Sequence, residues 1–458
     1  MSLSPPQVLP EGWELSRIGD RFASWGGHTP SKSNADYWGH GIPWVSSGEV
    51  KAARLSSSTH SVTRKAVDET GLKVCPIGCV LVVVRSGILA HSLPVAIADS
   101  PVTINQDMKA FYSEEPLLNE WLALFLRASA QALLQSSRRD GTTVQSVQYA
   151  LLKDTLLPIP PVTVRKPIID TIERAIEKQS SARPHIETSQ RVVERFRQSV
   201  LAAACSGRLT DDVSSTFDFD CFEREVELAR TSLSPKLRKP LTIDDSVELS
   251  EIPVDWKWMT IDQLTIDSIQ NGLYLPATRY GTGVPILRIE DFQLGASRSR
   301  DELKLVSATP DEQRRFALNF GDLVVNRVNS PSHLGKSLYV ETRHVPAVFE
   351  SNMMRVRLKA PMSARYVNLY LSSLNGRRRL TRNAKWAVNQ ASINQKDVRE
   401  CPVPVPPPDE QHEIVRRVED LFAGAGRLTT RLDTVSKRVD RISQAVLAKA
   451  FRGELLTK

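Results

Sequence analysis

Arginine and asparagine side chains follow two apolar stretches of the sequence, and these residue types can read nucleic-acid bases. Arg85 and Ser86 come directly after a run of apolar residues, and Asn326 and Arg327 close a similar run. Guanidinium and amide groups form paired hydrogen bonds with base edges, while hydroxyl and cationic groups hold phosphates. The pattern therefore makes these four residues candidate DNA contacts. The alternative is an arginine that only pairs with a surface carboxylate.

Other basic and hydroxyl side chains are weaker candidates for the same contacts. They are Lys32, Ser46, Ser47, Arg138, Arg139, Arg288 and Lys336. A denser cluster, Arg377, Arg378 and Arg379 with Arg382 and Lys385, lies further along the chain. Clustered arginines suit phosphate contacts, although such a cluster is more commonly a solvated face.

No residue pattern in the sequence indicates catalysis or a metal site. Gly335-Lys336-Ser337 resembles the end of a phosphate-binding loop, but Ser330 stands where such a loop needs its first glycine. We find no amino-methyltransferase motif, no glycine fingerprint for a methyl-donor cofactor and no zinc pattern. Cys75 and Cys79 lack a second pair of ligands, so buried thiols are expected there. Any catalysis is expected in partner chains.

The overall composition indicates a folded protein with anionic partners. The 458 residues are 41% hydrophobic and 24% charged, with a net charge of +8 at pH 7. This length suits two or three domains, and the basic balance favours nucleic acid as a partner. No apolar stretch is long enough for a membrane span, no secretory signal is evident, and the five scattered cysteines suit reduced thiols. We therefore expect a cytoplasmic protein.

The sequence contains an internal duplication. Residues 141–210 align without gaps on residues 387–456, at an offset of 246 residues. The starts of the two halves also correspond, Leu9-Pro-Glu-Gly-Trp13 with Ile252-Pro-Val-Asp-Trp256, at an offset of 243 residues. Between these landmarks the halves diverge. One scaffold therefore carries two different surfaces.

Each half combines short strand-like runs and turns with a proline-rich stop and then a long helical segment. This order predicts a mixed α/β (α+β) fold in which two globules are separated by two long helices. Apolar residues recur in alternating steps of four and three, which predicts an antiparallel coiled coil with pseudo-twofold symmetry. The predicted pairing residues are Ile168, Ile172, Val193, Phe196 and Val200 in the first segment, and Ile414, Val418, Leu421, Leu428, Leu432, Val435, Val439, Ile442 and Val446 in the second.

The first helical segment is expected to be the weaker of the two. Its apolar stripe is interrupted at Gln179 and Ser189, and Pro184 lies between them. Proline removes a backbone donor and clashes with the preceding turn, so a kink or break is expected near Arg183. The alternative to pairing is that each helix packs only on its own globule.

These patterns divide the chain into five segments. The expected boundaries are 1–157 for the first globule, 158–209 for the first helical region, 210–250 for a linker, 251–403 for the second globule and 404–458 for the second helical region. The linker contains a short amphipathic stretch around residues 222–233. Antiparallel helices would place the globules at opposite ends.

The chain resembles the specificity (S) subunit of type I restriction-modification enzymes, and the resemblance covers nearly all of it. Leu9–Trp13, Gly26-Gly-His-Thr-Pro-Ser31 and Ile42-Pro-Trp-Val-Ser46 are similar to the start of a target recognition domain of that family. The stretch Pro404-Val-Pro-Pro-Pro-Asp-Glu-Gln411 and residues 442–455 are similar to its conserved helical region. The first copy departs from this pattern at Val164-Arg165 and Pro167, so its helix is expected to start differently.

The resemblance implies a non-catalytic subunit whose two target recognition domains each read one half of a bipartite, asymmetric DNA target. It also implies that the paired helices fix the gap between the half-sites and dock two methyltransferase (M) subunits, with restriction/translocase (R) subunits completing the complex. No cofactor is then expected in this chain, because S-adenosylmethionine, ATP and Mg would act in the partner subunits. Two alternatives stay open: a coiled-coil adaptor that binds only protein, and a standalone DNA methyltransferase or nuclease.

Overall fold

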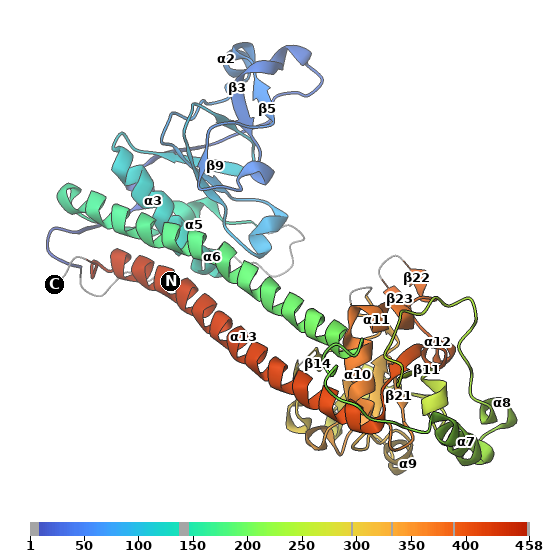
Figure 1. The fold of residues 1–458 in the computed structure, drawn as a ribbon. Coiled ribbons are helices and arrows are strands. Elements are labelled where there is room, and N and C mark those ends of the chain that lie inside the picture. The colour runs from blue at the N-terminus through green and yellow to red at the C-terminus, as the bar shows by residue number, and fades with distance from the viewer. Residues whose placement is uncertain (1–8, 137–145, 295, 331–332, 388–389, 456–458) are drawn as a thin grey trace. The chain divides into compact units, whose positions relative to one another are not determined.

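The computed structural model describes residues 9–136, 146–294, 296–330, 333–387 and 390–455. By its internal contacts the chain forms two compact units, unit 1 (Met1–Ile186 with Thr434–Lys458) and unit 2 (Glu187–Asp433). Two long helices, α6 (Val162–Ala204) and α13 (Pro408–Phe451), each contribute one part to either unit. Each unit therefore combines a strand-rich globule with segments of both helices (Figure 1).

Unit 1 is built on a central sheet with helices beside it. Its strands are β1 (Glu14–Arg17), β2 (Ala23–Gly26), β3 (Trp38–Val45), β4 (Arg54–Leu55), β5 (His60–Val62), β6 (Val80–Val83), β7 (Val95–Ala98), β8 (Thr103–Ile104), β9 (Met108–Tyr112) and β10 (Leu156–Ile159). Its shorter helices are α1 (Ile18–Arg21), α2 (Arg64–Thr70), α3 (Pro116–Ala128), α4 (Ala130–Ser136) and α5 (Tyr149–Asp154). Within the described part of this unit the sheets have the orders β2-β9-β6-β7-β4, β5-β3-β8 and β1-β10.

In the described parts of the chain, unit 2 has more strands than unit 1, and most of them are short. They are β11 (Lys257–Thr260), β12 (Gln270–Asn271), β13 (Tyr280–Leu287), β14 (Phe292–Gln293), β15 (Ala296–Ser297), β16 (Lys304–Val306), β17 (Leu323–Asn326), β18 (Val328–Asn329), β19 (Ser337–Tyr339), β20 (Val348–Phe349), β21 (Met353–Val356), β22 (Lys385–Ala387), β23 (Gln390–Ser392) and β24 (Pro402–Val405). The helices include α9 (Pro310–Arg315), α10 (Ala364–Ser372), α11 (Leu374–Leu380) and α12 (Gln395–Arg399). The sheet orders are β12-β21-β17-β19, β16-β13-β20, β18-β23-β22, β11-β24 and β14-β15.

The two units repeat the same strand pairing, which confirms the predicted duplication of a mixed α/β scaffold. β3 pairs antiparallel with β5 and parallel with β8, and β13 pairs in the same way with β16 and β20. The irregularity repeats as well, because β3 shifts register between Trp38 and Ile42 and β13 shifts between Tyr280 and Val284. Matched positions in the two units can therefore be compared residue by residue.

α6 continues through Pro184, so the helix has no break near Arg183, while a kink at this place stays a prediction. In unit 1 the amide Nε2 of Gln179 donates to Asp440 Oδ1 on α13 at 2.9 Å, and Arg183 forms an ion pair with the same carboxylate at 3.6 Å. These contacts immediately precede the proline. Contacts with α13 thus lie next to the helical turn in which Pro184 cannot donate a backbone hydrogen bond.

The two long helices also start at matched positions. α6 begins at Val162 and α13 at Pro408, which are related by the sequence offset of 246 residues. The different start that we expected for the first helix is therefore not found. In unit 2, Gln190 of α6 contacts Asp433 of α13, and Arg197, further along α6, contacts the earlier residue Thr429 of α13. The two helices therefore run antiparallel there.

The inward-facing stripes of the long helices differ in part from the predicted pairing residues. Ile168, Ile172, Val200, Ile414 and Val418 are buried, and Val193, Leu432, Val439 and Val446 are partly buried. However, Phe196, Leu421, Leu428, Val435 and Ile442 are about half exposed, and their neighbours Arg197, Phe422, Thr429, Ser436 and Ser443 are less exposed. For these five residues, pairing with the other long helix therefore stays a prediction. An apolar heptad pattern shows which side of a helix is apolar, but it does not decide which of two neighbouring residues on that side faces the partner helix.

The end of each long helix packs into a globule. In unit 1, Ala450 and Phe451 of α13 are fully buried in the core that contains α3. In unit 2, Leu201 and Ala204 of α6 are fully buried in the core of that globule. Each globule is therefore completed by the helix that follows the other globule in the sequence.

Both helices end in the same close contact with the start of a globule. Gly207 and Gly453 adopt left-handed backbone conformations, with φ of +78° and +75°. A Cβ atom on Gly207 would lie 2.3 Å from Cγ of Pro253, and one on Gly453 would lie 2.2 Å from Cγ of Pro10. The Leu/Ile-Pro-x-x-Trp motif and the helix-terminal glycine, which both recur in the sequence, are therefore contact partners.

The segment between the two halves is helical and packs on unit 2. The expected amphipathic stretch is α7 (Phe219–Ala229), whose Phe222 and Val226 are buried in the unit 2 core. A short 3-10 helix, Arg230–Ser232, and α8 (Pro235–Arg238) follow it.

No helix in the described ranges combines the length and apolar character needed to cross a membrane. The five cysteines are free thiols, and Cys75, Cys79 and Cys401 are buried.

Candidate nucleic-acid interface

In unit 1 the turn between β8 and β9 gathers the ends of several strands. The N–H of Asn105 donates to the carbonyl at the end of β3 (3.1 Å), and the N–H of Arg85, after β6, donates to the Asp107 carbonyl (3.2 Å). Gln106, between them, accepts a hydrogen bond from the Thr29 hydroxyl through its Oε1 at 2.6 Å. We call the region formed by this turn and the segments that it joins the strand-end edge of unit 1.

Unit 2 contains the matching strand-end edge at the turn between β20 and β21. The N–H of Glu350 donates to the carbonyl at the end of β13 (3.1 Å), and the N–H of Arg327 donates to the Asn352 carbonyl (2.8 Å). The N–H of Ser351 donates to the carbonyl of the residue before Tyr274 (3.0 Å). Backbone contacts thus bring together segments that are far apart in the sequence.

Arg85 lies on the strand-end edge of unit 1 and is paired with a carboxylate. Its Nε donates to Asp107 Oδ1 at 2.6 Å, and the side chain stays half exposed. The alternative that Arg85 pairs with a surface carboxylate therefore holds for the Nε side of its guanidinium. A charge-assisted bond of this kind fixes the orientation of the fork, which leaves its outer N–H groups facing solvent.

Two further candidates of unit 1 have local structural roles. The Ser46 hydroxyl donates to Glu49 Oε2 at 2.9 Å within a capping box. Ser86 accepts from the N–H of Ile88 and caps the 3-10 helix that follows it. The other candidates are Lys32, which is exposed, Ser47, which is partly exposed, and Arg138 and Arg139, which lie outside the described residues.

Arg327 and Arg85 do not occupy equivalent positions, contrary to our expectation. The registers of β6 and β17 match Arg327 with Val84, so Arg85 lies one residue further along the chain. A one-residue step reverses the face on which a side chain of an extended segment lies. Arg327 nevertheless belongs to the strand-end edge of unit 2, because its Nη1 donates to the Ser351 carbonyl at 3.3 Å.

Asn326 is fully buried, which contradicts its assignment as a DNA contact. Neither its Oδ1 nor its Nδ2 has a hydrogen-bond partner among the described residues. Burying an amide without hydrogen bonds costs stability, so asparagine is an unfavourable residue at this position of an apolar strand. A base edge cannot reach this side chain without a rearrangement of the strand end.

Lys336 and Arg377 form a cationic cluster beside the end of β17. The N–H of Asn326 donates to the Lys336 carbonyl (2.8 Å), and Arg377 Nε donates to the Leu334 carbonyl (3.0 Å). Burial, and after it the positive charge of Arg377, lowers the pKa of Lys336. Lys336 has no ion pair with a carboxylate within the described ranges, and Arg378 beside the cluster is exposed. A phosphate placed here would offset the repulsion between the cations.

Two other predicted arginines are held by the fold instead. Arg288 Nη1 donates to Glu290 Oε1 at 2.7 Å, and its Nε lies 3.6 Å from Glu350 Oε2. Burial raises the pKa of Glu350, while the Ile289 N–H and Arg288 oppose that shift. Arg379 donates to the Glu248 carbonyl at 3.0 Å and lies over the ring of Trp258 at 5.1 Å. Arg288 and Arg379 thus already have partners within the fold, and a DNA contact by either of them stays a prediction.

Three residues at the strand-end edges were not among the sequence candidates. They are Gln106, which is exposed, and the aromatic residues Tyr274 and Trp386, which are exposed despite their size. Each is a single polar or aromatic residue without a periodic pattern, so only the pairing of distant segments identifies it. The two edges together offer donors, acceptors, cations and aromatic rings, which are the groups that contact nucleic acids. Within the described ranges, no group of three or more His, Cys, Asp or Glu side chains is arranged to hold a metal ion.

Comparison with known proteins gives a consistent result. A family model described as "Type I restriction modification DNA specificity domain" matches residues 10–185 and 253–435. The specificity subunit of the type I restriction enzyme EcoKI from Escherichia coli (strain K12) is 25% identical over 459 residues, or 98% of this chain and 90% of that subunit. The EcoBI specificity subunit from Escherichia coli is 29% identical over 323 residues, which are 70% of this chain and 62% of that subunit. A solved chain, described under complex assembly and conformational transition of the type I R-M system, has a TM-score of 0.67 at 18% identity and covers 98% of this chain and 100% of its own length.

Proposed function

This chain belongs to the family of type I restriction-modification DNA specificity proteins, and we propose that its two units read the two halves of one split DNA target. The observation that carries this proposal is the strand-end edge, which recurs on the same scaffold with different side chains. A repeated scaffold fixes where a side chain is presented, and the side chain decides which base it prefers. Two edges that differ therefore suit two half-sites of different sequence.

Matched positions show how different the two edges are. Strand registers relate the positions directly, since β3 and β13, β6 and β17, and β9 and β21 pair in the same way. The matched pairs are Thr29 with Tyr274, Ser46 with Arg288, Val84 with Arg327 and Gln106 with Ser351. A palindromic target would need the same side chains in both units, so we infer an asymmetric target.

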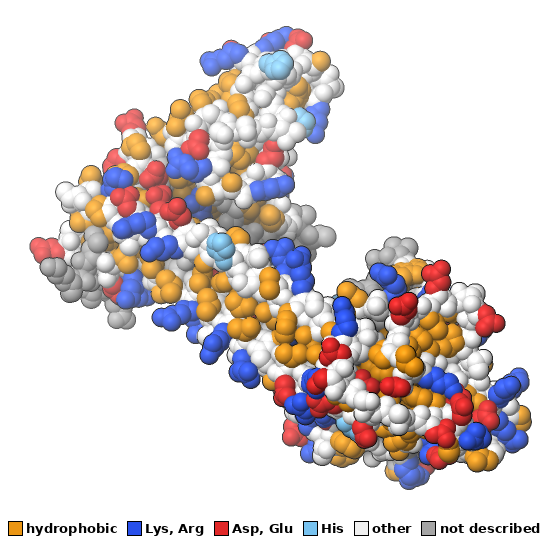
Figure 2. All heavy atoms as spheres, in the orientation of Figure 1, with side chains coloured by type: hydrophobic (Ala, Val, Ile, Leu, Met, Phe, Trp, Pro, Cys, Tyr) orange, Lys and Arg blue, Asp and Glu red, His pale blue; other side chains and the backbone are white. Residues whose placement is uncertain are grey.

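We infer that the long helices dock the methyltransferase subunits, with restriction subunits joining the complex. The half-exposed residues Leu421, Leu428, Val435 and Ile442 support this inference, because they recur every seven residues along α13. Figure 2 shows hydrophobic side chains gathered along the long helices. A regular apolar row on a helix is the surface that another helix covers.

We expect the chain to be non-catalytic alone, with S-adenosylmethionine, ATP and Mg acting in the partner subunits. The purified chain should neither transfer methyl groups from S-adenosylmethionine nor cleave DNA with ATP and Mg. The same assays after addition of the methyltransferase and restriction subunits provide the positive control. Activity of the chain without partners would show that it is an enzyme, and the proposed division of labour would then fail.

Replacing Arg327 with alanine should relax sequence preference in one half-site only. A well-placed arginine contributes about 1–3 kcal/mol of discrimination between bases, so the preference at one position should fall roughly 5- to 150-fold. Mapping methylated bases made by the assembled complex measures this preference at every position of the target.

The Arg85→Ala variant tests unit 1 separately, because the loss from this half-exposed arginine should appear in the opposite half-site. An equal loss of binding on all sequences would instead make either arginine a phosphate contact. Unchanged preference in both variants would remove the strand-end edge from the reading surface.

A further inference from the structure

Two large aromatic side chains at the strand-end edge of unit 2 are exposed to solvent. Tyr274 is 80% exposed and Trp386 is 65% exposed. A tryptophan normally buries most of its ring, because its large apolar surface favours packing. The fold therefore leaves two large aromatic surfaces at this edge available for a binding partner.

Trp386 lies on the outer strand of the small sheet that begins directly after Arg327. It lies on β22, which pairs with β23, and β23 pairs in turn with β18 through Val328 and Ser392. The N–H of Ile393 also donates to the Arg327 carbonyl at 2.9 Å. β18 begins directly after Arg327, so the strand that carries Trp386 belongs to the strand-end edge. Figure 1 shows β22 and β23 at the margin of unit 2, away from α7.

Tyr274 approaches Arg327 from a different segment. The carbonyl of its neighbour Leu273 accepts a hydrogen bond from the N–H of Ser351. The Ser351 carbonyl in turn accepts a hydrogen bond from Nη1 of Arg327. The same segment is joined to α12 by a hydrogen bond of 3.4 Å from Gln395 Nε2 to Asn271 Oδ1. Both exposed rings thus lie on segments that backbone hydrogen bonds join to the strand-end edge of unit 2.

The chain segment that leads to and carries Trp386 is rich in exposed cations. Lys385 precedes it on the same strand, and Arg378 and Arg382 lie shortly before it in the sequence; all three are exposed. Within the described ranges none of these three forms an ion pair with a carboxylate. An exposed ring on a segment with such cations fits a polyanion with flat apolar faces, and DNA is the polyanion of that kind.

We propose that Trp386 is a wedge that packs against the bases of the half-site bound by unit 2. This inference rests on the proposed function. The neighbouring cations hold the phosphates on either side, and the indole ring partly unstacks one base step. Unstacking is easiest at pyrimidine–purine steps, so this half-site should favour such a step. Unit 1 has Thr29 at the position of Tyr274, bonded to Gln106, so the two half-sites are read by different physical means.

The test uses the assembled complex and the target sequence that its own methylation pattern reveals. Duplexes of that sequence carry the fluorescent base 2-aminopurine at successive positions of each half-site. The complex with the natural chain should raise the fluorescence at one step of the unit 2 half-site. Trp386→Ala should abolish that rise and weaken binding about tenfold to a hundredfold, whereas Trp386→Phe should keep much of both. The salt dependence of binding should stay unchanged, because no charge is removed.

Phe320→Ala is the matched control, because Phe320 is 63% exposed and precedes the start of β17, at the opposite end of the strand from Arg327. This variant should bind and unstack the duplex like the natural chain. Equal behaviour of the Trp386→Ala complex, or loss of complex assembly as its only effect, would overturn the wedge. A natural complex without any sequence preference would instead overturn the proposed function.

Discussion

Replacing Phe451 with alanine is expected to lower the unfolding free energy of unit 1 by about 3–5 kcal/mol, the usual cost of deleting a buried phenyl ring. Phe451 is fully buried at the end of α13, and its ring centroid lies 4.5 Å from that of Trp121 and 5.3 Å from that of Phe125. Both partners belong to α3, so the ring ties the helix end to the globule. Hydrogen exchange should show faster opening of α3 and of the last turns of α13.

Two control variants distinguish the loss of the Phe451 anchor from the general effect of replacing a side chain with alanine. Cys205 in unit 2 occupies the matched sequence position, so Cys205→Ala removes a much smaller side chain and should cost less than about 1.5 kcal/mol. Ile442→Ala removes a half-exposed side chain from the same helix as Phe451 and should cost still less. If Phe451→Ala were no more destabilising than Ile442→Ala, the helix end would not be anchored in unit 1.

The duplicated scaffold could be predicted because it rests on patterns that survive divergence. Strand runs, turn glycines and the two helical segments recur at fixed offsets, and β6 and β17 are buried as the apolar runs indicate. The inward stripe of α13 could not be predicted fully. Leu421 and Phe422 are adjacent and both apolar, so the pattern allows either to face inward, and only packing decides between them.

The candidate site was harder to predict because it depends on single residues. Arg85 and Arg327 look equivalent in the sequence, yet the strand registers place them one residue apart. Arg379 looks like a free phosphate contact, but its guanidinium donates to a carbonyl and lies over an indole ring. Trp386 gave no periodic signal, since its exposure follows from the pairing of β18, β22 and β23. Sequence patterns thus locate strand ends but not the direction of each side chain.

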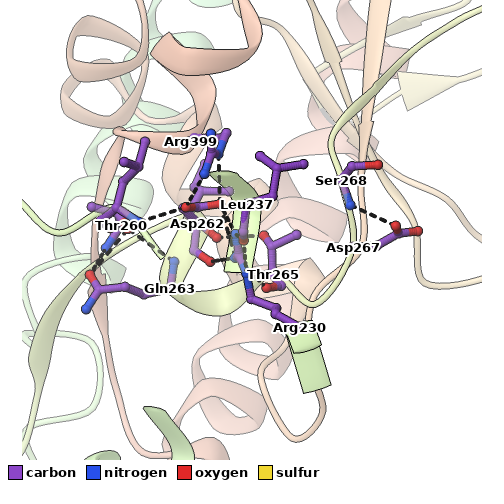
Figure 3. Close-up of polar contacts among 11 residues, drawn as sticks. Arg230, Leu237, Thr260, Asp262, Gln263, Thr265, Asp267, Ser268 and Arg399 are labelled. Carbon is purple, nitrogen blue, oxygen red and sulfur yellow. Dashed lines mark hydrogen bonds and ion pairs between the residues drawn. The ribbon is translucent and has the colours of Figure 1, made fainter. Parts of the chain in front are cut away.

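The segment between the two halves is held on unit 2 by a buried charge cluster (Figure 3). The Arg230 and Asp262 side chains are 1% and 3% exposed and form an ion pair at 3.1 Å. The Arg230 guanidinium also donates to the carbonyls of Leu237, Asp262 and Thr265. Arg399 Nη2 donates to the second oxygen of the Asp262 carboxylate at 2.8 Å. One carboxylate therefore compensates two arginines that are shielded from water.

Among its described residues, unit 1 has no counterpart of this cluster. The registers of β1 with β10 and of β11 with β24 match Asp262 with Gly19 and Arg399 with Lys153. A Cβ atom on Gly19 would already lie 3.0 Å from the Lys153 side chain. The intervening segment therefore recognises unit 2 through a charge that only this unit carries, which adds an asymmetry to the duplicated scaffold.

Asp262→Asn is expected to destabilise unit 2 by about 3–5 kcal/mol, because it leaves two arginines without their buried counter-charge. Hydrogen exchange and limited proteolysis should show α7 and α8 opening first, since Arg230 joins them to the globule. Asp267→Asn is the matched control, because Asp267 lies in the same region, is partly exposed and should tolerate the change. The double variant Arg230→Met with Asp262→Leu should lose less than Asp262→Asn alone, because both partners of the ion pair are then apolar. If Asp262→Asn left α7 as protected as in the natural chain, apolar packing of Phe222 and Val226 would hold the segment without the charge cluster.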